Sequence, residues 1–189
     1  LLKDTAKVRI HYSGYSGGFT ANITFAFIEG TPPRNVLAIN KLWNRSVPFG
    51  NANNPITSTI APVTITPPTG TVSSAMKFLI SGHGSDANGC SEFCSKYYDV
   101  LLDGNAIAHK DIWRANCGSN HIYPQSGTWI YDRGNWCPGD KVFDSYFPLT
   151  GMSAGVSKPV DIEFENYQIA SPSASYIISG YAYHYGAFN

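Results

Sequence analysis

Charge is scarce in this sequence. Asp, Glu, Lys and Arg make up 14% of the 189 residues, and the formal net charge is zero. A chain without an excess of either sign lacks the electrostatic attraction that nucleic acid or an anionic membrane surface requires, so we expect neither partner. The sequence also has no apolar run long enough for a membrane-spanning helix. These absences leave one globular domain, or one domain with part of another.

Two further features are missing. The chain begins Leu1-Leu2-Lys3, without Met and without a signal peptide, so we expect a processed or truncated product. No segment repeats its apolar residues with the helical period of 3.6, which disfavours helices. The aromatic content is high, with 12 Tyr, 10 Phe and 4 Trp. Such rings suit either the core of a β-sandwich or a surface that binds sugars.

Alternating apolar and polar residues predict strands. Residues 6–12 and 19–28 form a predicted hairpin, and Gly30-Thr31-Pro32-Pro33 then ends the pattern like a linker. Later strands are predicted at 36–43, 57–66, 72–81, 96–102, 142–149, 160–169 and 175–185, with a loop at 44–56. About eight strands after Pro33 predict an all-β fold, a jelly-roll β-sandwich with two long loops at one end.

Both long loops lie between residues 82 and 139, and all four cysteines fall within them. An even number of loop cysteines favours disulfides in an oxidising compartment, secreted or periplasmic. A zinc site of four thiolates is the alternative, but only Cys90 and Cys94 are spaced like a zinc-binding pair. Of the three possible connectivities, Cys90–Cys94 with Cys117–Cys137 is the simplest.

Glu92 lies between Cys90 and Cys94, inside the small ring that a disulfide would close. Such a ring would add only about 2 kcal/mol of stability. Its larger effect would be to hold the Glu92 carboxylate rigidly, as a catalytic or binding group requires. A solvated acid beside a structural disulfide is the alternative interpretation.

The second loop mixes aromatic and polar residues over residues 129–136. Rings that stack on sugars, beside groups that bond hydroxyls, are typical of a carbohydrate site. Arg133 would alternatively pair with Asp132 or Glu92 as a structural tie. His83, His109 and His121 also lie in the loops, but their spacing matches no metal-binding motif, so we expect no metal.

Together these blocks resemble the second domain of the peptide-N-glycosidase F family, bacterial amidases that remove N-linked glycans from asparagine. A Glu within a C-x3-C ring and an Asp-Arg-x-x-Trp-Cys-Pro-Gly run carry the resemblance. The matching segments are residues 80–84, 89–94, 117–120, 125–126 and 132–139. The resemblance is strong over residues 78–142 and weaker elsewhere.

The resemblance implies two adjacent jelly-roll domains with the sugar between them. Residues 1–30 would be the last hairpin of the first domain, most of which is missing, and residues 31–189 the second domain. The family's principal catalytic Asp then has no counterpart here, and Ser13 replaces a second acidic residue. The missing segment is an implied partner, as a separate chain or as the absent part of a longer protein.

The implied activity is hydrolysis of the amide between N-acetylglucosamine and asparagine, without a metal or other cofactor. The glycan leaves as a glycosylamine and the asparagine becomes Asp. Glu92 would be catalytic, and the substrate, an N-linked glycan or glycopeptide, would contact Arg133, Trp136, Phe93, His83 and Asp132. His83 stands where the family has an aromatic residue.

Two other functions remain open from the sequence. The first is a carbohydrate-binding module that keeps the aromatic site without catalysis, which the missing Asp and Ser13 favour for this chain alone. The second is a structural sandwich or a copper monooxygenase-like domain, since that fold is related. The histidine spacing counts against the copper enzyme.

Overall fold

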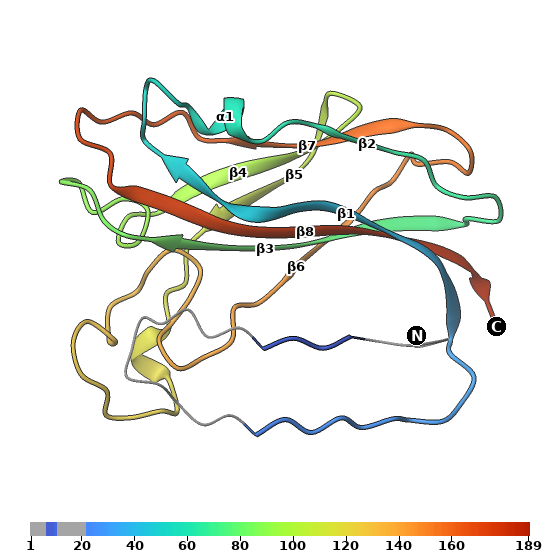
Figure 1. Ribbon diagram of the computed structural model, residues 1–189, viewed down its shortest axis with the longest axis horizontal. Helices are drawn as coiled ribbons and strands as arrows, with labels where there is room; N and C mark the ends of the chain where they lie inside the picture. The colour runs from blue at the N-terminus through green and yellow to red at the C-terminus, as the bar shows by residue number, and fades with distance from the viewer. Residues whose placement is uncertain (1–6, 11–21) are drawn as a thin grey trace.

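The structure is a computed structural model, and it describes residues 7–10 and 22–189. Figure 1 shows two layers of strands with loops gathered at one end. The elements in chain order are β1 (Arg34–Phe49), α1 (Ile56–Thr59), β2 (Val63–Ile65), β3 (Ser73–His83), β4 (Lys96–Leu102), β5 (Asn105–Ile112), η1 (Cys117–Ser119), β6 (Ser145–Pro148), β7 (Lys158–Phe164) and β8 (Ala174–Phe188). No helix in these ranges is long and apolar enough to cross a membrane.

The strands form two antiparallel sheets of four, with the orders β1-β8-β3-β6 and β2-β7-β4-β5. Each of β2, β3 and β4 lies in the sheet opposite to the strand before it, as do β6, β7 and β8. This interleaved order is that of a jelly roll. The predicted all-β sandwich is therefore confirmed.

Aromatic side chains fill the space between the sheets. Tyr98 and Tyr176 are fully buried, one from each sheet. Phe78 on β3 meets the ring of Tyr98 on β4 at a centroid distance of 5.2 Å. Phe164 on β7 stacks on Tyr176 of β8 at 5.8 Å. These contacts join the two sheets and leave the loops at the end of the sandwich to carry the polar chemistry.

Two sequence predictions were wrong in this region. A loop was expected at 44–56, but residues 44–49 continue strand β1. Because β1 lies at the edge of its sheet, Pro48, which has no backbone N–H, can be accommodated without the loss of a hydrogen bond between strands. The strand expected at 57–66 is instead the single helical turn α1 followed by the short edge strand β2. Pro62 separates these two elements.

The predicted N-terminal hairpin is only partly described. Residues 7–10 and 22–29 belong to no strand, whereas residues 1–6 and 11–21, which include the predicted turn and Ser13, lie outside the described residues. Apolar side chains of the described parts are exposed, including Phe27 at 79% and Ile28 at 93%. The assignment of residues 1–30 to an adjacent domain stays a prediction.

Candidate active site

The first loop is closed by a disulfide. Cys90 and Cys94 are bonded, as are Cys117 and Cys137, with Cα–Cα distances of 4.7 and 5.2 Å. The predicted pairing is therefore confirmed, and a metal site of four thiolates is wrong. Among residues 7–10 and 22–189, no three His, Cys, Asp or Glu side chains gather as metal ligands.

Asp86 fixes the small ring to the sandwich. Its Oδ1 accepts hydrogen bonds from the backbone N–H groups of Asn88 and Cys90, at 2.8 and 3.1 Å. Its Oδ2 accepts one from the Tyr167 hydroxyl at 2.6 Å. Tyr167 in turn stacks on Phe49 at the end of β1. The ring that carries Glu92 is thus tied to the segment after β7 and, through Tyr167, to the end of β1.

Three chain segments cross closely beneath Glu92. The Gly82 N–H donates to the Gly134 carbonyl at 2.8 Å, and the Gly134 N–H donates to the Glu92 carbonyl at 2.7 Å. A Cβ atom would lie 2.2 Å from the Ser91 carbonyl oxygen if added to Gly82, and 2.4 Å if added to Gly134. Only glycine fits at either position, so the two loops meet the end of β3 backbone to backbone.

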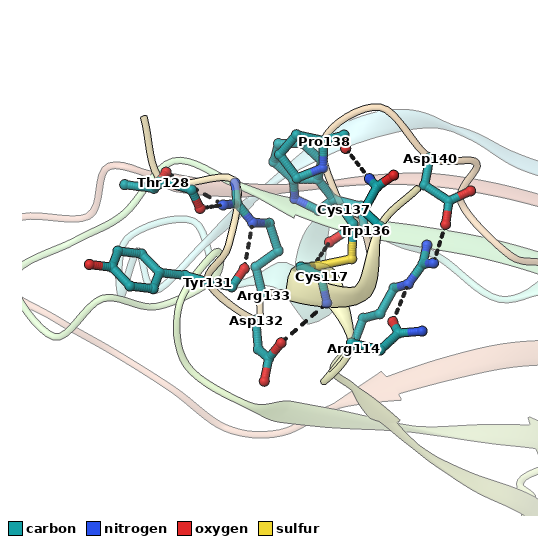
Figure 2. The surroundings of a disulfide bond; sticks show 12 residues. Arg114, Cys117, Thr128, Tyr131, Asp132, Arg133, Trp136, Cys137, Pro138 and Asp140 are labelled. Atoms are coloured by element: carbon teal, nitrogen blue, oxygen red, sulfur yellow. Dashed lines mark hydrogen bonds and ion pairs between the residues drawn. A yellow bond between two sulfur atoms is a disulfide. The ribbon is translucent and has the colours of Figure 1, made fainter. Parts of the chain in front are cut away.

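Arg133 is the buried hub of the site. Its Nη1 donates to Glu92 Oε1 at 2.9 Å, and the two side chains are 2% and 17% exposed. Its Nε donates to the Tyr131 carbonyl at 3.2 Å, and its Nη2 donates to the Thr128 carbonyl, as Figure 2 shows. Burial lowers the pKa of Arg133, and the Glu92 charge opposes that shift. The guanidinium therefore holds Glu92 and the second loop in one arrangement.

Two aromatic rings flank this guanidinium. Its Cζ lies 5.0 Å from the centroid of Phe93 and 4.7 Å from that of Trp136, within cation–π distance. The Trp136 indole donates to the Gly82 carbonyl at 2.6 Å. His83 stacks on Trp136 at 5.1 Å. The rings and the ion pair therefore form one packed unit.

His83 faces this unit in its neutral form. Burial lowers its pKa below the ordinary value of 6.5, and the Glu92 charge opposes that shift. Its Nε2 lies 2.8 Å from the Ser81 hydroxyl. At neutral pH the imidazole is thus an uncharged ring with hydrogen-bonding capacity, in a position where the sequence predicted an aromatic lining.

A groove of about 510 Å³ opens beside Arg133. It is lined by Phe93, Trp113, Thr128, Tyr131 and Asp132. Asp132 Oδ1 also accepts a bond from the Cys117 N–H at 3.3 Å, which ties the groove to the second disulfide (Figure 2). Two predicted binding residues, Phe93 and Asp132, therefore line a hollow next to Glu92.

Three residues of the groove, Trp113, Thr128 and Tyr131, were not predicted to contact the substrate. Trp113 joins the site through a neighbouring residue. It follows β5 directly, and an isolated antiparallel bridge joins its neighbour Arg114 to Arg133. The two backbone bonds of this bridge measure 2.9 and 3.2 Å. The only signal in the sequence is that Trp113 is one of three tryptophans between residues 82 and 139.

The sequence profile of a family described as "Peptide-N-glycosidase F, C terminal" matches residues 51–182, more than half of the chain. The chain belongs to the peptide-N-glycosidase F family. The predicted family is therefore confirmed. A search of curated proteins found no match.

Solved structures share the fold of this peptide-N-glycosidase F family member. The crystal structure of peptide-N(4)-(N-acetyl-β-D-glucosaminyl) asparagine amidase aligns with a TM-score of 0.74 and 24% identity, and covers 84% of this chain. PNGase F, a glycosylasparaginase from Flavobacterium meningosepticum, aligns with a TM-score of 0.72 and 24% identity, and covers 84% of this chain. PNGF-II aligns with a TM-score of 0.62 and 19% identity, and the alignment covers 79% of this chain and 30% of the PNGF-II chain. At these identities the likeness shows a common fold.

The chain spans about half the length of the first two of these structures, with 55% of each covered. His83 is the last residue of β3, and the other five predicted site residues lie in the two loops beside Gly82 and Gly134. Arg133 contacts Glu92, Phe93 and Trp136. Their roles in catalysis and binding stay predictions.

Proposed function

We propose that this chain carries the Glu92 side of a peptide-N-glycosidase site and acts together with an N-terminal domain. The reaction is hydrolysis of the amide between N-acetylglucosamine and asparagine in glycoproteins or glycopeptides. The observation that carries the proposal is the pair of Glu92 and the buried Arg133, held between two aromatic rings beside an open groove. Membership of the family supports the same reaction.

Hydrolysis here is addition of water to the amide carbonyl carbon. The amide bond between that carbon and the nitrogen then breaks, and one proton of the water passes to the departing nitrogen, which stays bonded to the sugar. The glycan leaves as a glycosylamine, and the former asparagine keeps the water oxygen as the carboxyl group of Asp. The base that activates this water is the family's principal catalytic Asp, which the resemblance places in the N-terminal domain.

Glu92 orients the substrate in this scheme. Arg133 occupies Oε1, so the second carboxylate oxygen is the one that accepts a hydrogen bond from the substrate near the scissile amide. Because the Arg133 side chain is 2% exposed and bonded to three partners, its proposed role is to position Glu92. This role differs from the direct sugar contact that the resemblance implied.

The sugar itself lies against the rings. Phe93 and Tyr131 border the groove, and Asp132 supplies an acceptor at its edge. His83 and Trp136 form a second aromatic wall beside Arg133. Rings with flat apolar faces next to a few oriented polar groups are what a pocket for a neutral sugar requires.

The Glu92→Gln variant tests the proposal. Glutamine keeps the shape but removes the charge, so glycan release from a denatured glycopeptide by the chain joined to its N-terminal domain should fall by about 10²- to 10⁴-fold. Glu163→Gln, an exposed acid on β7, serves as the matched control and should keep full activity. Release that is undiminished in Glu92→Gln, or absent from the completed wild-type protein, would reject the amidase.

A carbohydrate-binding module without catalysis is the second candidate. It is favoured by the complete aromatic groove in a chain that spans only half of its relatives. The expected result for such a module is protection of this chain against thermal unfolding by N,N′-diacetylchitobiose, with no glycan release by the completed protein.

The two disulfides fit an oxidising compartment, and we propose a secreted or periplasmic bacterial protein.

A further inference from the structure

A second hollow shares Trp113 with the groove beside Glu92. This polar hollow has a volume of about 460 Å³, and its lining residues are His109, Lys110, Asp111, Trp113, Ala115 and Asn135. Trp113 also lines the groove beside Glu92, so its side chain is common to both. The two hollows are therefore adjacent, and a ligand in one can continue into the other past the indole.

We propose that the polar hollow is a second sugar subsite, which takes glycan residues beyond those held in the groove. This inference rests on the proposed function, because it assigns the groove to the sugar next to asparagine. The volume falls within the range of roughly 300–1,000 Å³ that is usual for ligand pockets.

The lining supplies the chemistry that a neutral polyol needs. Lys110 is a donor, Asp111 is an acceptor, and both are exposed. Asn135 uses its amide nitrogen in a bond to the Ile80 carbonyl at 2.8 Å, which leaves the amide oxygen as an acceptor. One charge of each sign disfavours an ionic ligand, whereas sugar hydroxyls bond equally well to donors and acceptors. The indole of Trp113 adds an apolar surface for the ring of a sugar.

Several residues that line the hollow are held by contacts within the chain itself. His109 Nδ1 lies 2.7 Å from Asp99 Oδ1, and the imidazole packs against Tyr97 at 4.7 Å. On the opposite wall, Asn135 has a φ of 65° and is fixed by its bond to Ile80. Trp113 is held by the bridge between its neighbour and Arg133. A preformed wall reduces the entropy that binding would otherwise cost.

The test compares two ligands of different length. Chitobiose reaches only the groove, whereas the pentasaccharide with three mannoses on chitobiose reaches the polar hollow as well. Two-dimensional NMR of this chain should show both ligands shifting the Trp113 indole signal, assigned with Trp113→Phe. Only the pentasaccharide should shift the backbone signals of Lys110 and Asp111, and it should bind about tenfold more tightly than chitobiose.

The double variant Lys110→Ala/Asp111→Ala removes the polar groups at two exposed positions. It should reduce the affinity for the pentasaccharide to that for chitobiose, and leave the chitobiose affinity unchanged. Lys41→Ala, an exposed lysine on β1, is the control and should alter neither affinity.

The subsite would be overturned if the wild-type chain bound both ligands with equal affinity, or if the double variant left both affinities unchanged. It would also be overturned if neither sugar bound to the chain. Shifts of Lys110 and Asp111 caused by the unglycosylated peptide instead of the sugar would also overturn it, in favour of a peptide contact. The amidase proposal is judged separately, by the glycan release of Glu92→Gln, so the two failures are distinguishable.

Discussion

The sandwich and its loop end are stabilised by different interactions. Between the sheets, whole aromatic side chains such as Tyr98, Tyr176 and Phe78 are removed from water and contact one another. The loop end is stabilised mainly by two disulfides, backbone hydrogen bonds and the Arg133–Glu92 ion pair. The core thus depends on apolar volume, whereas the site depends on specific bonds.

This difference determines how each region should respond to mutation. A core tolerates changes that conserve volume, because many weak contacts share the stabilisation. At the site, backbones touch at Gly82 and Gly134, and the buried Arg133 donates to three acceptors. A single added or deleted atom there disrupts these contacts. We therefore expect the site to be lost by changes smaller than those that unfold the sandwich.

Gly134→Ala should give the largest effect. Its Cβ would lie 2.4 Å from the Ser91 carbonyl oxygen and 3.2 Å from the Gly82 Cα, both of them backbone atoms that cannot move aside. The expected loss is about 3 kcal/mol in the free energy of unfolding, measured by urea titration. Gly118→Ala is the matched control, because its nearest contact is the flexible Ile130 side chain at 3.4 Å. A similar, small loss in both variants would show that the crossing does not define the site.

Arg133→Lys should follow, with a loss of about 2 kcal/mol. Lysine keeps the charge, but a single ammonium cannot replace the bonds to Glu92, Tyr131 and Thr128 that the guanidinium makes together. Urea titration measures the free energy of unfolding of both Arg133→Lys and the control Arg45→Lys, at an exposed position of β1. The difference between the two losses gives the contribution of the buried Arg133 bonds. If both substitutions leave stability unchanged, the buried ion pair contributes nothing to the loop end and the contrast with the core fails.

Sequence patterns predicted the sandwich better than the site. β3, β4 and β8 were found because their alternation is long and one face of each is buried. β1 was cut short because Pro48 and the asparagines around it resemble a loop, although an edge strand accepts proline. α1 is a single turn, too short for any period to register.

An ion pair between Glu92 and Arg133 was one of the interpretations open from the sequence, whereas the backbone crossing that brings these residues together was not predicted. The C-x3-C ring pointed to Glu92, and the resemblance added Arg133 and Trp136. The contacts that join them depend on Gly82 and Gly134 approaching a common backbone, and nothing local in the sequence encodes that meeting. Trp113 was missed for the same reason, since the bridge between Arg114 and Arg133 pairs residues from separate loops.

The smallest effect concerns a histidine buried inside the sandwich. His184 on β8 is fully buried, with Nδ1 2.7 Å from the Ser74 hydroxyl and Nε2 2.9 Å from Asn40 Oδ1. Burial lowers its pKa below the ordinary value of 6.5. The unfolded chain therefore binds a proton that the folded protein does not, and the free energy of unfolding should decrease as the pH falls below 6.5.

His184→Gln should weaken this dependence, although it also lowers stability at pH 7 by disturbing the bonds to Ser74 and Asn40. Urea titrations at pH 7 and pH 5 measure the slope, and the exposed His121→Gln should keep the wild-type slope. His83 contributes in the same direction from the loop end, because burial lowers its pKa as well. A slope that survives in His184→Gln but disappears in His83→Gln would assign the acid sensitivity to the site and leave the core to apolar packing alone.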